Sequence, residues 1–163
     1  MVNVIIRKYE AADLDAVKAI WNEVIEDGSA FAEEGPLSEQ EAAALFDRQT
    51  YAAVAESDDG LIVGAYILHP NFPGRLSHIC NASYAVQKSR RGQHIGEKLV
   101  LDCIEQARRA GFRILQLNAV LESNLPARRL YERLGFRQVG TIPKGFRMKA
   151  GSYENICPYY LEL

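Results

Sequence analysis

The chain has 163 residues, and we expect residues 1–163 to form a single domain around one core. Its formal net charge of −2 argues against nucleic acid or an anionic membrane surface as a partner, because both require a basic surplus. No apolar run approaches the roughly 18 residues of a membrane span, and residues 1–10 lack the basic and apolar regions of a signal peptide.

The cysteines Cys80, Cys103 and Cys157 are odd in number and widely spaced. We therefore expect free thiols and a cytoplasmic location. The three histidines show no spacing typical of a metal site, so no metal cofactor is expected.

In the N-terminal half, residues 2–8 are predicted to form a strand, and Asp13 to cap a helix. Ser38 and Glu41 have the form of a capping box that opens a short second helix. Two apolar runs, 51–57 and 61–68, flank Asp58-Asp59-Gly60, which predicts a hairpin. The face of the first helix is formed by the residues Leu14, Val17, Trp21, Val24 and Ile25.

In the C-terminal half, residues 76–86 are predicted to form a strand, and a helix begins near Gln93 and stops at Gly111. Residues 114–120 are strand-like, and Ser123 or Asn124 can cap a further helix that Gly135 ends. Two strands, 136–142 and 153–161, close the chain. This order predicts an α/β fold with a mixed central sheet of about seven strands and helices on both faces.

The segment Arg91-Gly92-Gln93-His94-Ile95-Gly96 lies between a predicted strand and a predicted helix. Its glycines allow a ligand to approach the backbone closely, and the first turn of a helix offers free N–H groups. Such a loop binds a phosphate or pyrophosphate. The alternative is an ordinary strand-to-helix turn with solvated arginines.

Two other phosphate-binding loops are excluded. The Gly-Lys-Ser/Thr ending of the P-loop does not occur in the chain. The dinucleotide fingerprint G-x-G-x-x-G is incomplete, because only Gly92 and Gly96 are present.

The loop resembles the acyl-CoA loop of GCN5-related N-acetyltransferases, the GNAT family, whose pattern is (Gln/Arg)-x-x-Gly-x-(Gly/Ala). Arg91 and Gly96 match this pattern, and His94 stands where the family usually has its middle glycine. A later segment resembles the family's N-x-x-A-x-x-L-Y-x-x-x-G-F, with the matching residues Asn124, Ala127, Leu130, Tyr131, Gly135 and Phe136. The resemblance implies the GNAT fold and the use of acetyl-CoA as cosubstrate.

A narrower resemblance concerns the acceptor. Residues 71–82, together with Asn118 and Asn124, look like the matching region of fungal N-acetyltransferases that act on the proline analogue azetidine-2-carboxylate. This resemblance implies a small amino or imino acid, or a toxic analogue, as the amine acceptor, and a role in detoxification.

The resemblance also implies how acetyl-CoA is held. Backbone N–H groups of Gln93, His94, Ile95 and Gly96 would bind the pyrophosphate, next to the positive charge of Arg91. The extended pantetheine arm would lie beside the backbone of Tyr84, Ala85 and Val86, like an added strand. Asn124 would hydrogen-bond this arm, although it can also act only as a helix cap.

Direct transfer to an amine requires that the amine lose a proton. An alkylamine with a pKa of about 10 is about one part in a thousand neutral at pH 7, which costs roughly 4 kcal/mol. His78 is one candidate base, and a water relayed by Asn81 or Asn118 is another, with Glu122 a further candidate. A bulge near Tyr84–Val86 could aim a backbone N–H at the thioester oxygen.

Tyr131 is the family-matched donor to the thioester sulfur. Its phenol is a weaker acid than a thiol, so we expect it to donate a hydrogen bond rather than a proton. Asn81 and Asn118 can each donate and accept, which suits an acceptor with an amine and a carboxylate. Arg75 could bind the carboxylate, and Trp21 and Phe31 are candidate walls of the pocket.

Two other functions remain open. A protein N-terminal or lysine acetyltransferase would require an open groove, and a non-catalytic acyl-CoA sensor would bind the cosubstrate without turnover. The aromatic residues Tyr153, Tyr159 and Tyr160 near the C-terminus suggest a homodimer contact.

Overall fold

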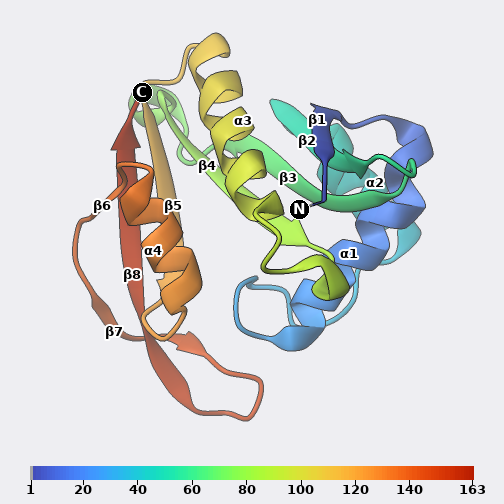
Figure 1. The fold of residues 1–163 in the computed structure, drawn as a ribbon. Helices are drawn as coiled ribbons and strands as arrows, with labels where there is room; N and C mark the ends of the chain where they lie inside the picture. The colour runs from blue at the N-terminus through green and yellow to red at the C-terminus, as the bar shows by residue number, and fades with distance from the viewer. Residues whose placement is uncertain (1) are drawn as a thin grey trace.

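A computed structural model describes residues 2–163 of the chain (Figure 1). The first half contains β1 (Val4–Lys8), α1 (Leu14–Asp27), α2 (Glu39–Asp47), β2 (Tyr51–Ser57) and β3 (Ile62–Pro70). The second half contains β4 (Ile79–Val86), α3 (Ile95–Arg109), β5 (Ile114–Leu121), α4 (Leu125–Arg133), β6 (Arg137–Gln138), β7 (Ile142–Arg147) and β8 (Tyr153–Glu162).

The strands form one mixed sheet in the order β1-β2-β3-β4-β5-β8-β6, with β7 also paired to β8. β4 and β5 run parallel, as expected for two strands joined through a helix, whereas the other described pairs are antiparallel. The predicted mixed sheet is therefore confirmed. It has eight strands rather than about seven, because both β6 and β7 pair with the outer edge of β8.

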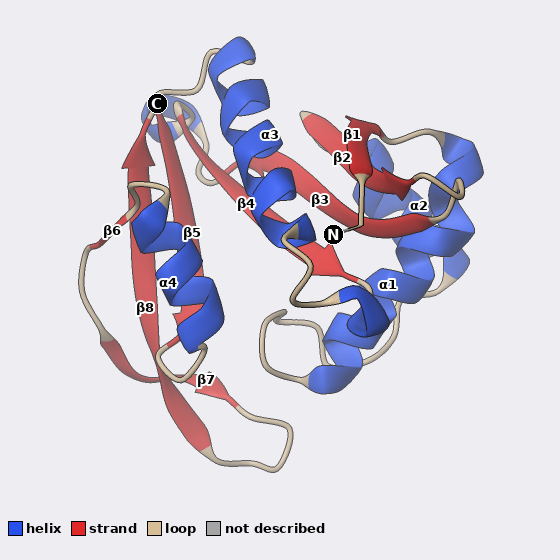
Figure 2. Cartoon of the chain, in the orientation of Figure 1, coloured by secondary structure: helices blue, strands red, loops and turns tan. Residues whose placement is uncertain are grey.

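Helices cover both faces of the sheet (Figure 2). On one face, α3 packs on Val63, Leu68 and other buried residues of the central strands, and α4 adds Leu130 and Tyr131 at its margin. On the other face, α1 and α2 pack through Trp21 and Phe46. The central strands β2, β3 and β4 therefore turn alternate side chains to two separate cores.

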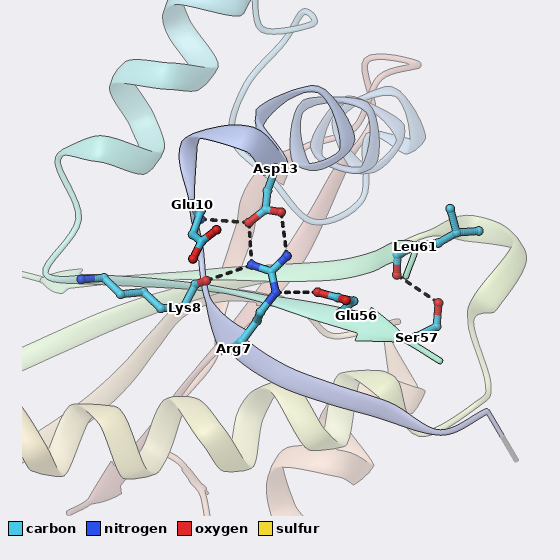
Figure 3. Close-up of polar contacts among 7 residues, drawn as sticks. All are labelled: Arg7, Lys8, Glu10, Asp13, Glu56, Ser57 and Leu61. Carbon is cyan, nitrogen blue, oxygen red and sulfur yellow. Dashed lines mark hydrogen bonds and ion pairs between the residues drawn. The ribbon is translucent and has the colours of Figure 1, made fainter. Parts of the chain in front are cut away.

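Arg7 joins the first strand to the start of α1 (Figure 3). Its guanidinium donates to both carboxylate oxygens of Asp13, at 2.9 and 2.8 Å, and to Glu56 on β2 at 2.5 Å. Asp13 stands at the N-cap of α1 as predicted, but its side chain makes no capping bond there and accepts instead from the backbone N–H of Glu10. The Arg7 hydrogen bonds hold the pKa of Asp13 below its ordinary value.

The other predicted caps are confirmed. Ser38 and Glu41 form the capping box of α2, and the Asn124 side chain accepts from the N–H of Ala127 at the start of α4. Two predicted strands had wrong bounds. The strand expected over 76–86 begins only at Ile79, and the one expected over 136–142 shrinks to β6, while β7 was not predicted.

Cys80, Cys103 and Cys157 are buried and unpaired. Burial raises the pKa of both the Cys80 and the Cys103 thiol to about 12. None of the helices in residues 2–163 has the length and apolar character needed to cross a bilayer. Within the same residues, no three His, Cys, Asp or Glu side chains gather in a way that could hold a metal ion.

Candidate active site

The site begins where two neighbouring strands separate. β4 and β5 pair only through residues 79–81 and 114–116, and beyond that point the two strands diverge (Figure 1). β4 continues to Val86 and β5 to Leu121. The separation leaves one edge of β4 open, at the ends of the strands where ligands bind in such sheets.

Two residues of β4 turn their backbone groups to this open edge. The N–H of Asn71 bonds to the carbonyl of Ile79, and the N–H of Gln87 bonds to the carbonyl of Val63. These two bonds show that the backbone groups of Ile79 and Gln87 point toward β3. Because the direction alternates along an antiparallel pair, the backbone of Ala85 points toward β3 as well, whereas the backbone groups of Tyr84 and Val86 point into the gap. A peptide-like ligand can therefore pair with Tyr84 and Val86, but not with the backbone of Ala85.

The loop before α3 has two left-handed residues. Gly92 has a φ of 76° and His94 a φ of 61°. The middle position of the loop thus requires positive φ, which is uncommon for a residue other than glycine. The helical hydrogen bonds of α3 start with the N–H of Lys98, which donates to the carbonyl oxygen of His94 at 3.3 Å. The N–H groups of the first turn of α3, which begins at Ile95, are thus available to an anion.

The basic residues of this loop are tied to the end of α1. Asp27 accepts from Arg91 at 2.8 Å and from Lys88 at 3.3 Å, and these contacts lower the pKa of the Asp27 carboxyl. Arg91 also donates to the carbonyl of Val86 at 3.3 Å. The positive charge expected at the loop is therefore partly neutralised by Asp27.

A cavity of about 350 Å³ opens through the gap between β4 and β5. Its residues come from α1 and the loop after it, the end of α2, the end of β3, both diverging strands and α4. They are Trp21, Ser29, Ala30, Phe31, Ala32, Glu33, Leu45, Arg48, Ile67, His69, Asn81, Ala82, Ser83, Tyr84, Leu117, Asn118, Ala119, Val120, Leu121, Asn124, Ala127 and Tyr131.

Two tyrosines lie at the α3–α4 side of the cavity. The rings of Tyr84 and Tyr131 are 6.5 Å apart, and Tyr84 is packed beside the Cys103 thiol. Burial raises the pKa of Tyr131 to about 12. A raised pKa makes the Tyr131 phenol a poorer proton donor, which favours a hydrogen bond to a thiolate over full proton transfer.

Two asparagines lie at the opposite side of the cavity. Asn81 donates to the carbonyl of Gln116 at 2.9 Å, and its own carbonyl oxygen has no partner in residues 2–163. Asn118 forms a reciprocal amide pair with Asn71, at 3.0 and 2.8 Å. Asn81 can therefore accept a hydrogen bond from a ligand, while Asn118 is largely occupied.

Trp21 and Phe31 form one wall of this cavity. Their rings stack at 4.6 Å, and Trp21 also belongs to the core beneath α1. The Trp21 indole nitrogen is buried and has no hydrogen-bond partner in the described part of the chain.

Other candidate residues lie outside the cavity. His78 was expected on a strand, but it lies in an exposed turn just before β4, where its backbone carbonyl bonds to Arg113. Arg75 lies in an exposed single turn of 3-10 helix, over Gly74–Leu76. Glu122 accepts from Asn155 at 2.9 Å and does not line the cavity either.

The structure adds Glu33, Arg48 and His69, which no motif indicated. A signal existed for His69, since it is the first polar side chain after the apolar run of β3. The bulge expected near Tyr84–Val86 is absent from the continuous β3–β4 register. A one-residue shift lies instead in β5, between Leu117 and Val120.

A sequence model of the Acetyltransferase (GNAT) family matches residues 17–136. The chain belongs to the GNAT family. A solved GCN5-related N-acetyltransferase from Kribbella flavida superposes on it with a TM-score of 0.91, at 32% identity, over 98% of both chains.

Two curated GNAT relatives have related activities in their names. N-acetyltransferase aca1 of Schizosaccharomyces pombe is 40% identical over 54% of this chain but only 42% of its own length. The L-methionine sulfoximine/L-methionine sulfone acetyltransferase of Pseudomonas aeruginosa is 30% identical over 85% of this chain and 83% of that protein. As a GNAT member the chain is an acetyl-transferring enzyme, with acetyl-CoA as the acetyl donor.

Proposed function

We propose that this GNAT enzyme acetylates the amine of a small amino or imino acid, or of a toxic analogue, by direct transfer from acetyl-CoA. The observation that carries the proposal is the cavity of about 350 Å³, which is near the lower limit of ligand pockets and combines a cation, an imidazole and an amide. A small zwitterion has complementary groups for all three.

The loop and the open edge of β4 hold the cosubstrate. The N–H groups of Gly92, Gln93, His94, Ile95 and Gly96 bind the pyrophosphate. The pantetheine amides pair with Tyr84 and Val86, and Asn124 contributes its side chain while also capping α4. The space beside Gly96 is open to a ligand, because a Cβ at this position would have only Val86 within 4 Å, at 3.9 Å.

The reaction takes place where the gap opens into the acceptor cavity. The amine attacks the thioester carbonyl, and the backbone N–H of Tyr84 or Val86 that the pantetheine amides leave free stabilises the oxyanion. Tyr131 donates a hydrogen bond to sulfur as negative charge develops there. Asn81 accepts from the amine, and Trp21 and Phe31 enclose the side chain of the acceptor.

Arg48 replaces Arg75 as the partner of the acceptor carboxylate. Arg48 ends α2 at the rim of the cavity and forms no ion pair within residues 2–163. A guanidinium binds a carboxylate through two parallel hydrogen bonds. The names of relatives that acetylate methionine sulfoximine or its sulfone are consistent with an acceptor of this class.

A panel of acceptors tests the proposal. The purified enzyme is incubated with acetyl-CoA and free amino acids, proline analogues, methionine sulfoximine, polyamines and peptides, and products are measured by mass spectrometry. We expect free amino or imino acids to give a higher kcat/KM than their carboxamides. A preference for peptides would contradict the proposal, and coenzyme A binding without any turnover would indicate a sensor.

A further inference from the structure

His69 lies on the acceptor side of the cavity, directly opposite Asn81. The two residues are cross-strand partners in the β3–β4 register. Ala65 and Ile67 belong to the core beneath α1 and α2, and the alternation of a strand places His69 on the same face. The imidazole is therefore a near neighbour of the Asn81 amide, with Cβ atoms about 5 Å apart as in any directly opposed pair.

The hydrogen bond of the ring defines its tautomer. His69 Nδ1 lies 2.9 Å from the backbone carbonyl oxygen of Pro70. A carbonyl oxygen only accepts hydrogen bonds, so the proton of the neutral ring is on Nδ1. Nε2 then carries the lone pair. This tautomer is the one that a proton acceptor at Nε2 requires.

The other titratable groups that line the cavity are less suitable as bases. Arg48, from the end of α2, is a cation, and burial raises the pKa values of the phenols of Tyr84 and Tyr131. Glu33, from the loop after α1, is exposed. His69 is held by a regular strand, which positions it more firmly than a loop can.

We propose that His69 is the general base of the reaction and takes the proton of the acceptor ammonium at Nε2. This inference rests on the proposed acetyl transfer to an amine. Loss of that proton leaves a neutral amine, whose nitrogen forms a bond to the thioester carbon. When the intermediate collapses, the carbon–sulfur bond breaks, and the second proton of the nitrogen passes to the departing sulfur, so that coenzyme A leaves as the thiol. His69 releases its proton to water, so one proton is produced for each acetyl group transferred.

Kinetics of His69→Gln test the role, with His78→Gln as the matched control in an exposed turn. With the best acceptor of the panel we expect a loss in kcat/KM of roughly 10²-fold or more at pH 7, and an unchanged Kd for acetyl-CoA. The defect should shrink as the pH approaches the pKa of the amine, where a base is no longer needed. A purely structural role would give a loss that is independent of pH.

Glu33→Gln tests whether Glu33, rather than His69, is the general base. If this variant loses the activity while His69→Gln retains it, Glu33 is the base and the proposal for His69 is wrong. If the wild-type enzyme acetylates amines other than amino acids, the substrate proposal fails, and the comparison of His69→Gln with wild type on those amines still decides the role of His69.

The tautomer can be measured without any acceptor. Nitrogen-15 NMR of the histidine rings, assigned with His69→Gln and His78→Gln, should show a protonated Nδ1 and an unprotonated Nε2 for His69 above pH 8. A proton on Nε2 would overturn the proposal, because the nitrogen assigned to proton transfer would then be a donor.

Discussion

The proposed cosubstrate half and the proposed acceptor half of the active site are built in different ways. The loop proposed to bind pyrophosphate, the open edge of β4 and the start of α3 are continuous over residues 84–96. The acceptor cavity draws on six separate segments, from α1 with its following loop to α4. A site that is local in sequence leaves a motif, whereas a site assembled by the fold leaves single residues without a pattern.

The largest expected effect lies where the two halves meet. Tyr131→Phe would remove the proposed hydrogen bond to sulfur without changing the loop before α3, and we expect kcat to fall by about 10²-fold. The Kd of acetyl-CoA, measured by calorimetry, should remain the same. An unchanged kcat under conditions in which chemistry is rate-limiting would remove Tyr131 from the mechanism.

The acceptor half is tested next by Arg48→Gln. Loss of the guanidinium should raise KM for amino acids by about 10-fold or more, since a charge-assisted pair contributes roughly 1.5–3 kcal/mol. The KM for the decarboxylated amine should not change. Arg75→Gln, outside the cavity, is the control, and an equal effect of Arg48→Gln on both acceptors would contradict carboxylate binding.

Gly92→Val tests the cosubstrate half alone. Gly92 has a φ of +76°, which a β-branched side chain adopts only with strain. We expect acetyl-CoA to bind about 10-fold more weakly, which corresponds to about 1.4 kcal/mol. The control is Gly140→Val, where an added Cβ meets nothing within 4 Å and φ is not positive. Equal affinities of the two variants would show that the loop conformation does not control binding.

The smallest expected effect comes from the ion pairs that join the loop before α3 to the end of α1. Asp27 holds Arg91 and Lys88 at the end of α1, so Asp27→Asn should free their charge and tighten acetyl-CoA binding about two- to threefold at low salt. The gain should disappear at high ionic strength. Calorimetry at two salt concentrations measures it, and weaker binding by the variant would mean that Asp27 positions Arg91 for the phosphates.

The same difference explains which features the sequence could reveal. Hydrophobic periodicity and local caps predicted most helices and strands, and the loop motif is the basis of the proposed phosphate site. Strand β7 was missed because Pro143-Lys144-Gly145 has the composition of a turn, and Lys144 has a φ of 56°. In the structure, Lys144 adopts this left-handed conformation, and its backbone N–H donates to the side-chain oxygen of Asn155 at 3.0 Å.

The histidines and arginines show most clearly what the sequence alone could not predict. His78 and His69 were equally available from sequence, but only the start of β4 at Ile79 and the pairing of β3 decide which one reaches the cavity. Arg48 lines the cavity because it lies on the short connection between α2 and β2, whose first residue pairs with Leu68 beside His69, and this pairing leaves no local signal in the sequence.

The three enclosed cysteines have a practical consequence for studying this enzyme. A disulfide reagent added to a running reaction meets no accessible thiol within residues 2–163, so the reagent titrates the thiol of coenzyme A. Turnover can thus be followed continuously by colour without blocking the protein. A slow additional signal approaching three equivalents per chain would report denaturation during the same recording.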